Sequence, residues 1–127
     1  MAKILIIEDD TALRTVLKRT LLPFGHEVFE ADDGNEGLKL FRRVAVDLIV
    51  TDIVMPEKDG LEILMELKKL HSTVKVIAMS GGGRGQPREY LHMAKALGAT
   101  VVLEKPFGSE ALMAAVDALL PAGTAAE

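Results

Sequence analysis

Short apolar runs alternate with amphipathic stretches along the whole chain. The runs that predict strands lie at positions 4–7, 26–31, 47–51, 74–79 and 100–103. After each run, apolar residues recur every three or four positions. This spacing predicts helices over about 12–21, 35–44, 61–70, 87–97 and 110–120. Five strands alternating with five helices indicate an α/β fold, in which a parallel sheet has helices on both faces.

Residues suited to starting helices stand before several of these segments. Asp10 or Thr11 can cap the first helix, Pro87 suits the first turn of the fourth, and Ser109 is expected to cap the last. We therefore assign Asp10 to the helix rather than to direct metal binding. The histidines share no ligand spacing, and we expect all three at the surface or its boundary: His26, His71 and His92.

Length and composition narrow the class of protein. A chain of 127 residues with 49% hydrophobic and 27% charged residues has the size and balance of one globular domain. It contains no cysteine, which excludes a disulfide framework and a thiolate metal site. The first apolar run is too short for a signal peptide or a membrane span, so we expect a cytoplasmic protein without membrane contact. The net charge of −4 disfavours direct contact with nucleic acid.

Polar residues follow the predicted strands at their carboxyl ends, where open α/β sheets bind their ligands. Glu8 and Asp9 follow the first strand, Asp52 the third, Ser80 the fourth and Lys105 the fifth. Neighbouring carboxylates repel one another, and Mg²⁺ is the hard cation that relieves this repulsion while leaving positions for phosphate oxygens. A carboxylate held beside a metal ion and a lysine can act as a nucleophile toward phosphorus. Asp52 is therefore a candidate phospho-acceptor.

Four motifs extend this prediction to a family. The segments ILIIEDD, TDIVMPEKDG, IAMS and LEKPF, in this order, resemble the receiver domain of bacterial two-component response regulators, of the CheY-like single-domain type. The resemblance covers residues 3–120 and leaves 121–127 as a flexible tail. It implies a flavodoxin-like (βα)5 three-layer sandwich with a parallel five-stranded sheet in the order 2-1-3-4-5. It also implies a cis peptide bond before Pro106.

The same resemblance implies a role for each site residue. Asp52 is expected to accept a phosphoryl group, with Ser80 as the switch hydroxyl and Lys105 as the site lysine. The expected Mg²⁺ ligands are Glu8, Asp9, Asp52 and the main-chain carbonyl of Val54. A histidine kinase or phosphotransfer protein would donate the phosphoryl group. The signal would pass to an unknown downstream protein through helix 87–97 and the adjoining strand and helix. The chain would be a self-phosphorylating and autodephosphorylating signalling protein rather than an enzyme.

Two departures from the family pattern leave the output mechanism open. Val102 stands where the family usually has Tyr or Phe, and the loop over residues 81–85 is longer and richer in glycine than usual. We expect this loop to be mobile and to let Ser80 move, with partner contact through Arg84 or Arg88 as the alternative. Three other interpretations remain: a pseudo-receiver that binds partners without phosphorylation, an aspartyl-phosphate enzyme, and a module cut from a longer regulator.

Overall fold

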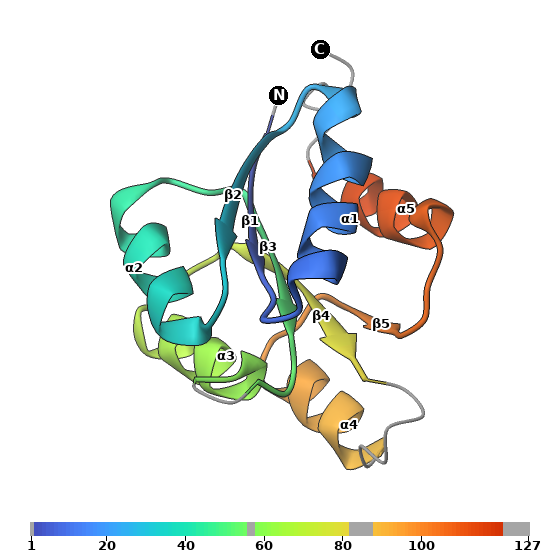
Figure 1. Cartoon of the computed structure of the whole chain (residues 1–127). Helices are drawn as coiled ribbons and strands as arrows, with labels where there is room; N and C mark the ends of the chain where they lie inside the picture. Colours follow the sequence, from blue (N-terminus) through green and yellow to red (C-terminus); the bar gives the residue numbers. More distant parts are fainter. Residues whose placement is uncertain (1, 56–57, 82–87, 121–127) are drawn as a thin grey trace.

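The computed structural model is a three-layer α/β sandwich (Figure 1). It describes residues 2–55, 58–81 and 88–120. The elements are β1 (Lys3–Ile7), α1 (Thr11–Leu21), the 3₁₀ turn η1 (Leu22–Phe24), β2 (Glu27–Ala31), α2 (Gly34–Arg43), β3 (Leu48–Asp52), α3 (Gly60–Lys69), β4 (Lys75–Ser80), α4 (Arg88–Ala96), β5 (Val101–Glu104) and α5 (Ser109–Leu119).

All strands run parallel, in the order β2-β1-β3-β4-β5. This confirms the predicted flavodoxin-like order. The peptide bond between Lys105 and Pro106 is cis, as the resemblance implied. The predicted helix 87–97 is described as Arg88–Ala96, while the predicted loop beyond Gly81 and the predicted tail 121–127 lie outside the described residues.

Two apolar clusters hold the layers together, one on each face of the sheet. Alternate residues of β1 enter opposite clusters: Leu5 and Ile7 pack toward α2, α3 and α4, whereas Ile4 and Ile6 pack toward α1 and α5. The same alternation occurs in β3 and β4. Burial of both faces explains why these strands appear in the sequence as unbroken apolar runs. Within the described ranges, no helix combines the length and apolar character that a membrane span requires.

Polar caps fix where the helices begin. Asp10 caps α1, since its Oδ1 accepts hydrogen bonds from the amides of Ala12 at 2.9 Å and Leu13 at 3.2 Å. This confirms the helix role predicted for Asp10. The prediction for Ser109 is wrong: Gly108 is the N-cap of α5, without a side-chain hydrogen bond, and Ser109 is the first helical residue.

The prediction for His26 is also wrong. His71 and His92 are exposed, but His26 lies directly before β2 with only 3% of its surface exposed. Neither ring nitrogen has a hydrogen-bond partner among the described residues. Burial lowers the pKa of His26, and Asp117 opposes this effect. His26 is therefore a buried neutral imidazole at the end of the sheet opposite the carboxyl ends of the strands.

Candidate functional site

The carboxyl ends of four strands bring the predicted site residues to one edge of the sheet. Glu8 follows β1, Asp52 ends β3, Ser80 ends β4 and Lys105 follows β5. Backbone hydrogen bonds continue past the strand ends and hold this edge in register. The amide of Glu8 donates to the carbonyl of Ala31 at 3.1 Å, and the amide of Lys105 donates to that of Ser80 at 2.9 Å. The site residues thus stand where backbone hydrogen bonds tie the ends of neighbouring strands together.

Lys105 links the two buried carboxylates of this edge. Its Nζ lies 3.1 Å from Oε1 of Glu8 and 3.3 Å from Oδ2 of Asp52. Glu8 is 1% exposed and Asp52 is 6% exposed. Buried carboxylates without a compensating charge are costly, so one lysine shared between them partly offsets their repulsion. The contacts also place a cation directly beside Asp52.

The pKa values of these three groups are all raised, for different reasons. Burial raises the pKa of Glu8, opposed chiefly by the hydrogen bond that its Oε2 accepts from the amide of Asp10 at 3.0 Å. Burial also raises the pKa of Asp52, opposed by Lys105. Burial alone would lower the pKa of Lys105, but the carboxylates of Asp52 and Glu8 outweigh it and raise that pKa. Lys105 is therefore held as a cation, while the carboxylates remain short of positive charge.

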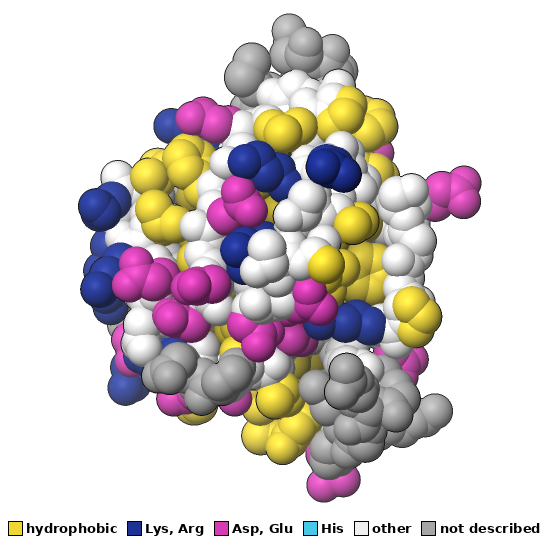
Figure 2. Space-filling view, in the orientation of Figure 1, with side chains coloured by type: hydrophobic (Ala, Val, Ile, Leu, Met, Phe, Trp, Pro, Cys, Tyr) yellow, Lys and Arg dark blue, Asp and Glu magenta, His cyan; other side chains and the backbone are white. Residues whose placement is uncertain are grey.

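Glu8, Asp9 and Asp52 form a group that could hold a metal ion. Each offers one carboxylate oxygen, and these oxygens lie within 4.8 Å of one another. Oδ1 of Asp52 is buried and has no hydrogen-bond partner in the described part of the chain. An all-carboxylate set with an unsatisfied buried oxygen fits a hard divalent cation such as Mg²⁺. Acidic side chains gather on the surface of Figure 2 where β1 and β3 end in Figure 1. The carbonyl of Val54 as a further ligand stays a prediction.

Ser80 and Val102 lie on the neighbouring strands β4 and β5. Ser80 is buried at 4% exposure, beside the backbone of Lys105. Val102 pairs in register with Ala78 and packs, partly buried, against the cluster that faces α4. A groove of about 260 Å³ lies over Val102 and is lined also by His92, Lys95 and Glu104. The structure thus brings Ser80 to the site edge and leaves a groove over Val102.

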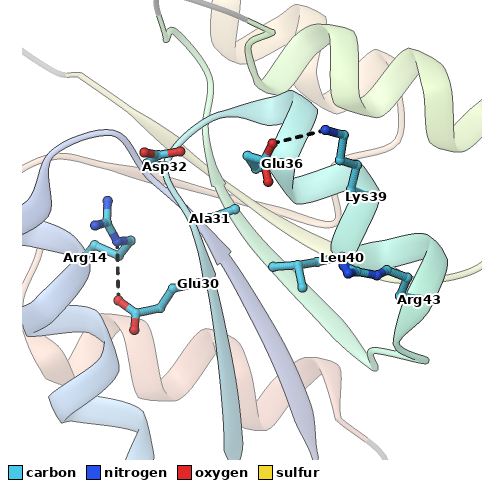
Figure 3. Close-up of a pocket in the computed structure, with 8 residues that line it drawn as sticks. All are labelled: Arg14, Glu30, Ala31, Asp32, Glu36, Lys39, Leu40 and Arg43. Atoms are coloured by element: carbon cyan, nitrogen blue, oxygen red, sulfur yellow. Dashed lines mark hydrogen bonds and ion pairs between the residues drawn. The ribbon is translucent and has the colours of Figure 1, made fainter.

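Sequence reasoning missed one residue that contacts this site. Nη1 of Arg14 donates a hydrogen bond to the main-chain carbonyl of Glu8 at 2.7 Å. Arg14 also lines a pocket of about 380 Å³ between α1, β2 and α2 (Figure 3). This pocket does not include the carboxylates of Glu8, Asp9 or Asp52. In the sequence Arg14 is only a basic residue on an amphipathic helix, so no local signal distinguishes it.

The family model and the sequence relatives that match this chain point to the same family. The family model described as the response regulator receiver domain matches residues 4–117. The chain is 38% identical over 120 residues to the transcriptional regulatory protein CpxR of Klebsiella pneumoniae, covering 94% of this chain and 50% of that protein. It is 31% identical over 119 residues to sporulation initiation phosphotransferase F of Bacillus subtilis, covering 94% of each.

Solved structures with a similar fold belong to proteins of the same kind. Chemotaxis protein CheY4 of Vibrio cholerae superposes with a TM-score of 0.85 at 30% identity, covering 94% of this chain and 99% of that one. The receiver domain protein of Clostridium thermocellum superposes with the same TM-score at 32% identity, covering 94% of both chains. The chain spans about half the length of CpxR and a quarter of the NtrC relative from Azospirillum brasilense.

Proposed function

Because this chain belongs to the response regulator receiver domain family, whose members are signalling proteins of two-component systems, we propose that Asp52 accepts a phosphoryl group from a phosphohistidine. The donor is a histidine kinase or a phosphotransfer protein. The observation that carries the proposal is the pairing of Lys105 with Asp52, beside a buried carboxylate oxygen that lacks a partner among the described residues. The proposal takes residues 3–120 as the receiver unit and the cytoplasm as its location.

The transfer is a displacement at phosphorus. A carboxylate oxygen of Asp52 forms a bond to phosphorus while the phosphorus–nitrogen bond of the donor breaks, and its electron pair returns to the imidazole ring. Glu8, Asp9, Asp52 and the main-chain carbonyl of Val54 would hold Mg²⁺, which would supply positive charge for the phosphoryl oxygens. Lys105 is already a cation beside Asp52, and it orients and stabilises the same oxygens without moving a proton.

The change of charge at Asp52 is the signal. After transfer, Lys105 faces a phosphoryl group in place of a bare carboxylate, and the Ser80 hydroxyl is drawn toward the new oxygens. The Ser80 carbonyl accepts a hydrogen bond from the amide of Lys105, so movement at the end of β4 is coupled to β5. A downstream partner reads the altered surface of α4, β5 and α5. Because Val102 carries no ring, this output works without a rotating aromatic side chain.

The test is labelling of the chain by a small phosphodonor such as acetyl phosphate in the presence of Mg²⁺. We expect Mg²⁺-dependent labelling of the wild type and none of Asp52→Ala. Undiminished labelling of Asp52→Ala would remove Asp52 from the mechanism. The variant Asp9→Ala should bind Mg²⁺ much more weakly, and an unchanged affinity would remove Asp9 from the metal site.

A binding module that keeps this pocket without using phosphorylation is the second candidate. Val102 and the groove above it favour this alternative, since the usual aromatic element of the output is missing. The two functions differ in one measurement. Beryllofluoride with Mg²⁺ mimics a phosphorylated aspartate, and it should change partner affinity for a switch but leave it unchanged for a plain binding module.

A further inference from the structure

Arg14 connects the acidic edge of the sheet to the neighbouring strand. From α1, its Nη1 donates a hydrogen bond to the carbonyl of Glu8 at 2.7 Å. Its Nε donates one to Oε1 of Glu30 at 3.3 Å (Figure 3). The Arg14 side chain is only 17% exposed. Glu30 lies on β2, so one guanidinium links α1 and β2 to the residue that follows β1. Its planar set of donors suits two acceptors at fixed positions better than a lysine does.

The carbonyl that Arg14 holds belongs to the peptide group between Glu8 and Asp9. A peptide group is planar, so fixing its carbonyl oxygen also fixes the direction in which the chain leaves toward the Cα of Asp9. Glu8 has further restraints, because its amide donates to Ala31 and its carboxylate accepts from Asp10 and Lys105. Asp9 is exposed. Its carboxylate therefore depends on the orientation of this peptide group to reach the other two.

We propose that Arg14 is a positioning residue for divalent cation binding, one that orients the Glu8–Asp9 peptide group so that the Asp9 carboxylate faces Asp52. The inference rests on the proposed function, in which Glu8, Asp9 and Asp52 hold the cation. Positioning and charge predict opposite changes in Mg²⁺ affinity when Arg14 is replaced. A positive side chain repels a metal ion, so electrostatics alone predicts tighter Mg²⁺ binding when the guanidinium is removed. Positioning predicts weaker binding.

Lys18 provides a matched control for the charge. Its Nζ pairs with Oε2 of Glu30 at 3.0 Å, on the same carboxylate that receives Arg14. Lys18→Met and Arg14→Met both remove one positive charge and one ion pair with Glu30. Only Arg14→Met removes the hydrogen bond to the carbonyl of Glu8. A third variant, Arg14→Lys, keeps the charge, but its single ammonium cannot reproduce the two-point contact.

The experiment is calorimetric titration of the full chain with Mg²⁺ alone. We expect about tenfold weaker binding for Arg14→Met, as is typical when a residue that orients metal ligands is lost. Arg14→Lys should also bind more weakly, and Lys18→Met should bind as tightly as the wild type or slightly more so. Unchanged or tighter binding by both Arg14 variants would overturn the proposal. A purely structural role would lower the unfolding temperature in the absence of Mg²⁺ and leave the affinity of the folded protein unchanged, which would equally overturn it.

The titration separates failure of this inference from failure of the proposed function. If the wild type does not bind Mg²⁺, or Asp9→Asn binds it as tightly as the wild type, the carboxylate site itself is wrong. If the wild type binds and Asp9→Asn does not, while both Arg14 variants match the wild type, only the role of Arg14 is wrong. If Arg14→Met fails to fold, Arg14→Lys gives the same comparison at constant net charge.

Discussion

Adding one methyl group at Gly60 tests how closely α3 packs against the backbone of Asp52. Gly60 is the first residue of α3, and its amide donates to the carbonyl of Ile53 at 2.9 Å. A Cβ at this position would lie 2.3 Å from the carbonyl oxygen of Asp52 and 2.9 Å from the Cα of Ile53. The close atoms belong to the backbone, so no side-chain rotation can relieve the contact. The variant Gly60→Ala must therefore move either α3 or the residue proposed to accept phosphate.

The size of the effect follows from these distances. Real Cβ contacts below 3.0 Å essentially never occur, so the Asp52 carbonyl and α3 must separate by about 0.7 Å. Overpacking of this kind costs about 1–3 kcal/mol. For a domain of 127 residues, each kcal/mol shifts the unfolding temperature by roughly 4 °C, so we expect a fall of roughly 4–12 °C. The displaced Asp52 should also bind Mg²⁺ more weakly.

Thermal unfolding followed by circular dichroism, with and without Mg²⁺, measures both effects. Gly108→Ala is the matched control, because a methyl group there meets nothing within 4 Å. It should cost no more than about 1 kcal/mol, from the weaker N-cap preference of alanine. Equal unfolding temperatures and equal Mg²⁺ affinities for Gly60→Ala and the wild type would refute the close approach of Gly60 to Asp52.

Three further predictions concern charge, capping and pH. Burial raises the pKa of Asp52, so its ionised form disfavours the folded state at neutral pH. Asp52→Asn should therefore raise the unfolding temperature without Mg²⁺ and reduce the stabilisation that Mg²⁺ gives. A lower unfolding temperature without Mg²⁺ would contradict this. Gly108→Asp should stabilise α5 by about 0.5–1 kcal/mol in urea unfolding, through a side-chain cap and a favourable helix dipole, and no gain would show that this helix end is already satisfied. The folded-state pKa of His26 lies below its unfolded value of 6.5, so protons bind more readily to the unfolded chain. His26 therefore costs no stability above that pH and lowers the stability progressively below it. His26→Leu should therefore lose less stability than the wild type between pH of about 7.5 and about 5.5, and equal losses would place the titration elsewhere.

The buried strands were predictable because both faces of the sheet are covered. An unbroken run such as Ile4 to Ile7 needs apolar partners on two sides, and the structure supplies them in two clusters. The order of the strands could not be derived from the residues, since many orders satisfy the same alternation of strands and helices. The correct order came only from the family resemblance.

The site residues that directly end or follow strands could be predicted from the sequence. The contacts that depend on how helices pack could not. Glu8, Asp52 and Lys105 meet because parallel strands deliver their next residues to one edge. The contact of Arg14 depends on the rotation of α1 about its axis, which the packing of Leu17 and Leu21 decides. The burial of His26 likewise has no signal in the residues around it in the sequence, and Asp117, far away in the chain on α5, lies close enough to affect its pKa. Contacts between segments far apart in sequence leave no local pattern to read.

The predicted N-cap of α5 was wrong by one residue. Gly108 and Ser109 are adjacent, and serine is the better N-cap residue, yet α5 begins one residue earlier than that preference indicates. The observed helix start thus differs from the predicted one by a single residue. It changes no site residue, but it leaves the first turn of α5 without a side-chain cap.

The most direct test of the account is to locate the phosphoryl group chemically. The full chain is incubated with acetyl phosphate and Mg²⁺, and the acyl phosphate is reduced with borohydride. The protein is then digested, and mass spectrometry identifies the changed residue. We predict that only the peptide containing residue 52 changes, that hydroxylamine added before the borohydride prevents the change, and that it is absent without Mg²⁺. Modification at another residue, or labelling that resists hydroxylamine, would contradict the claim that Asp52 is the acceptor.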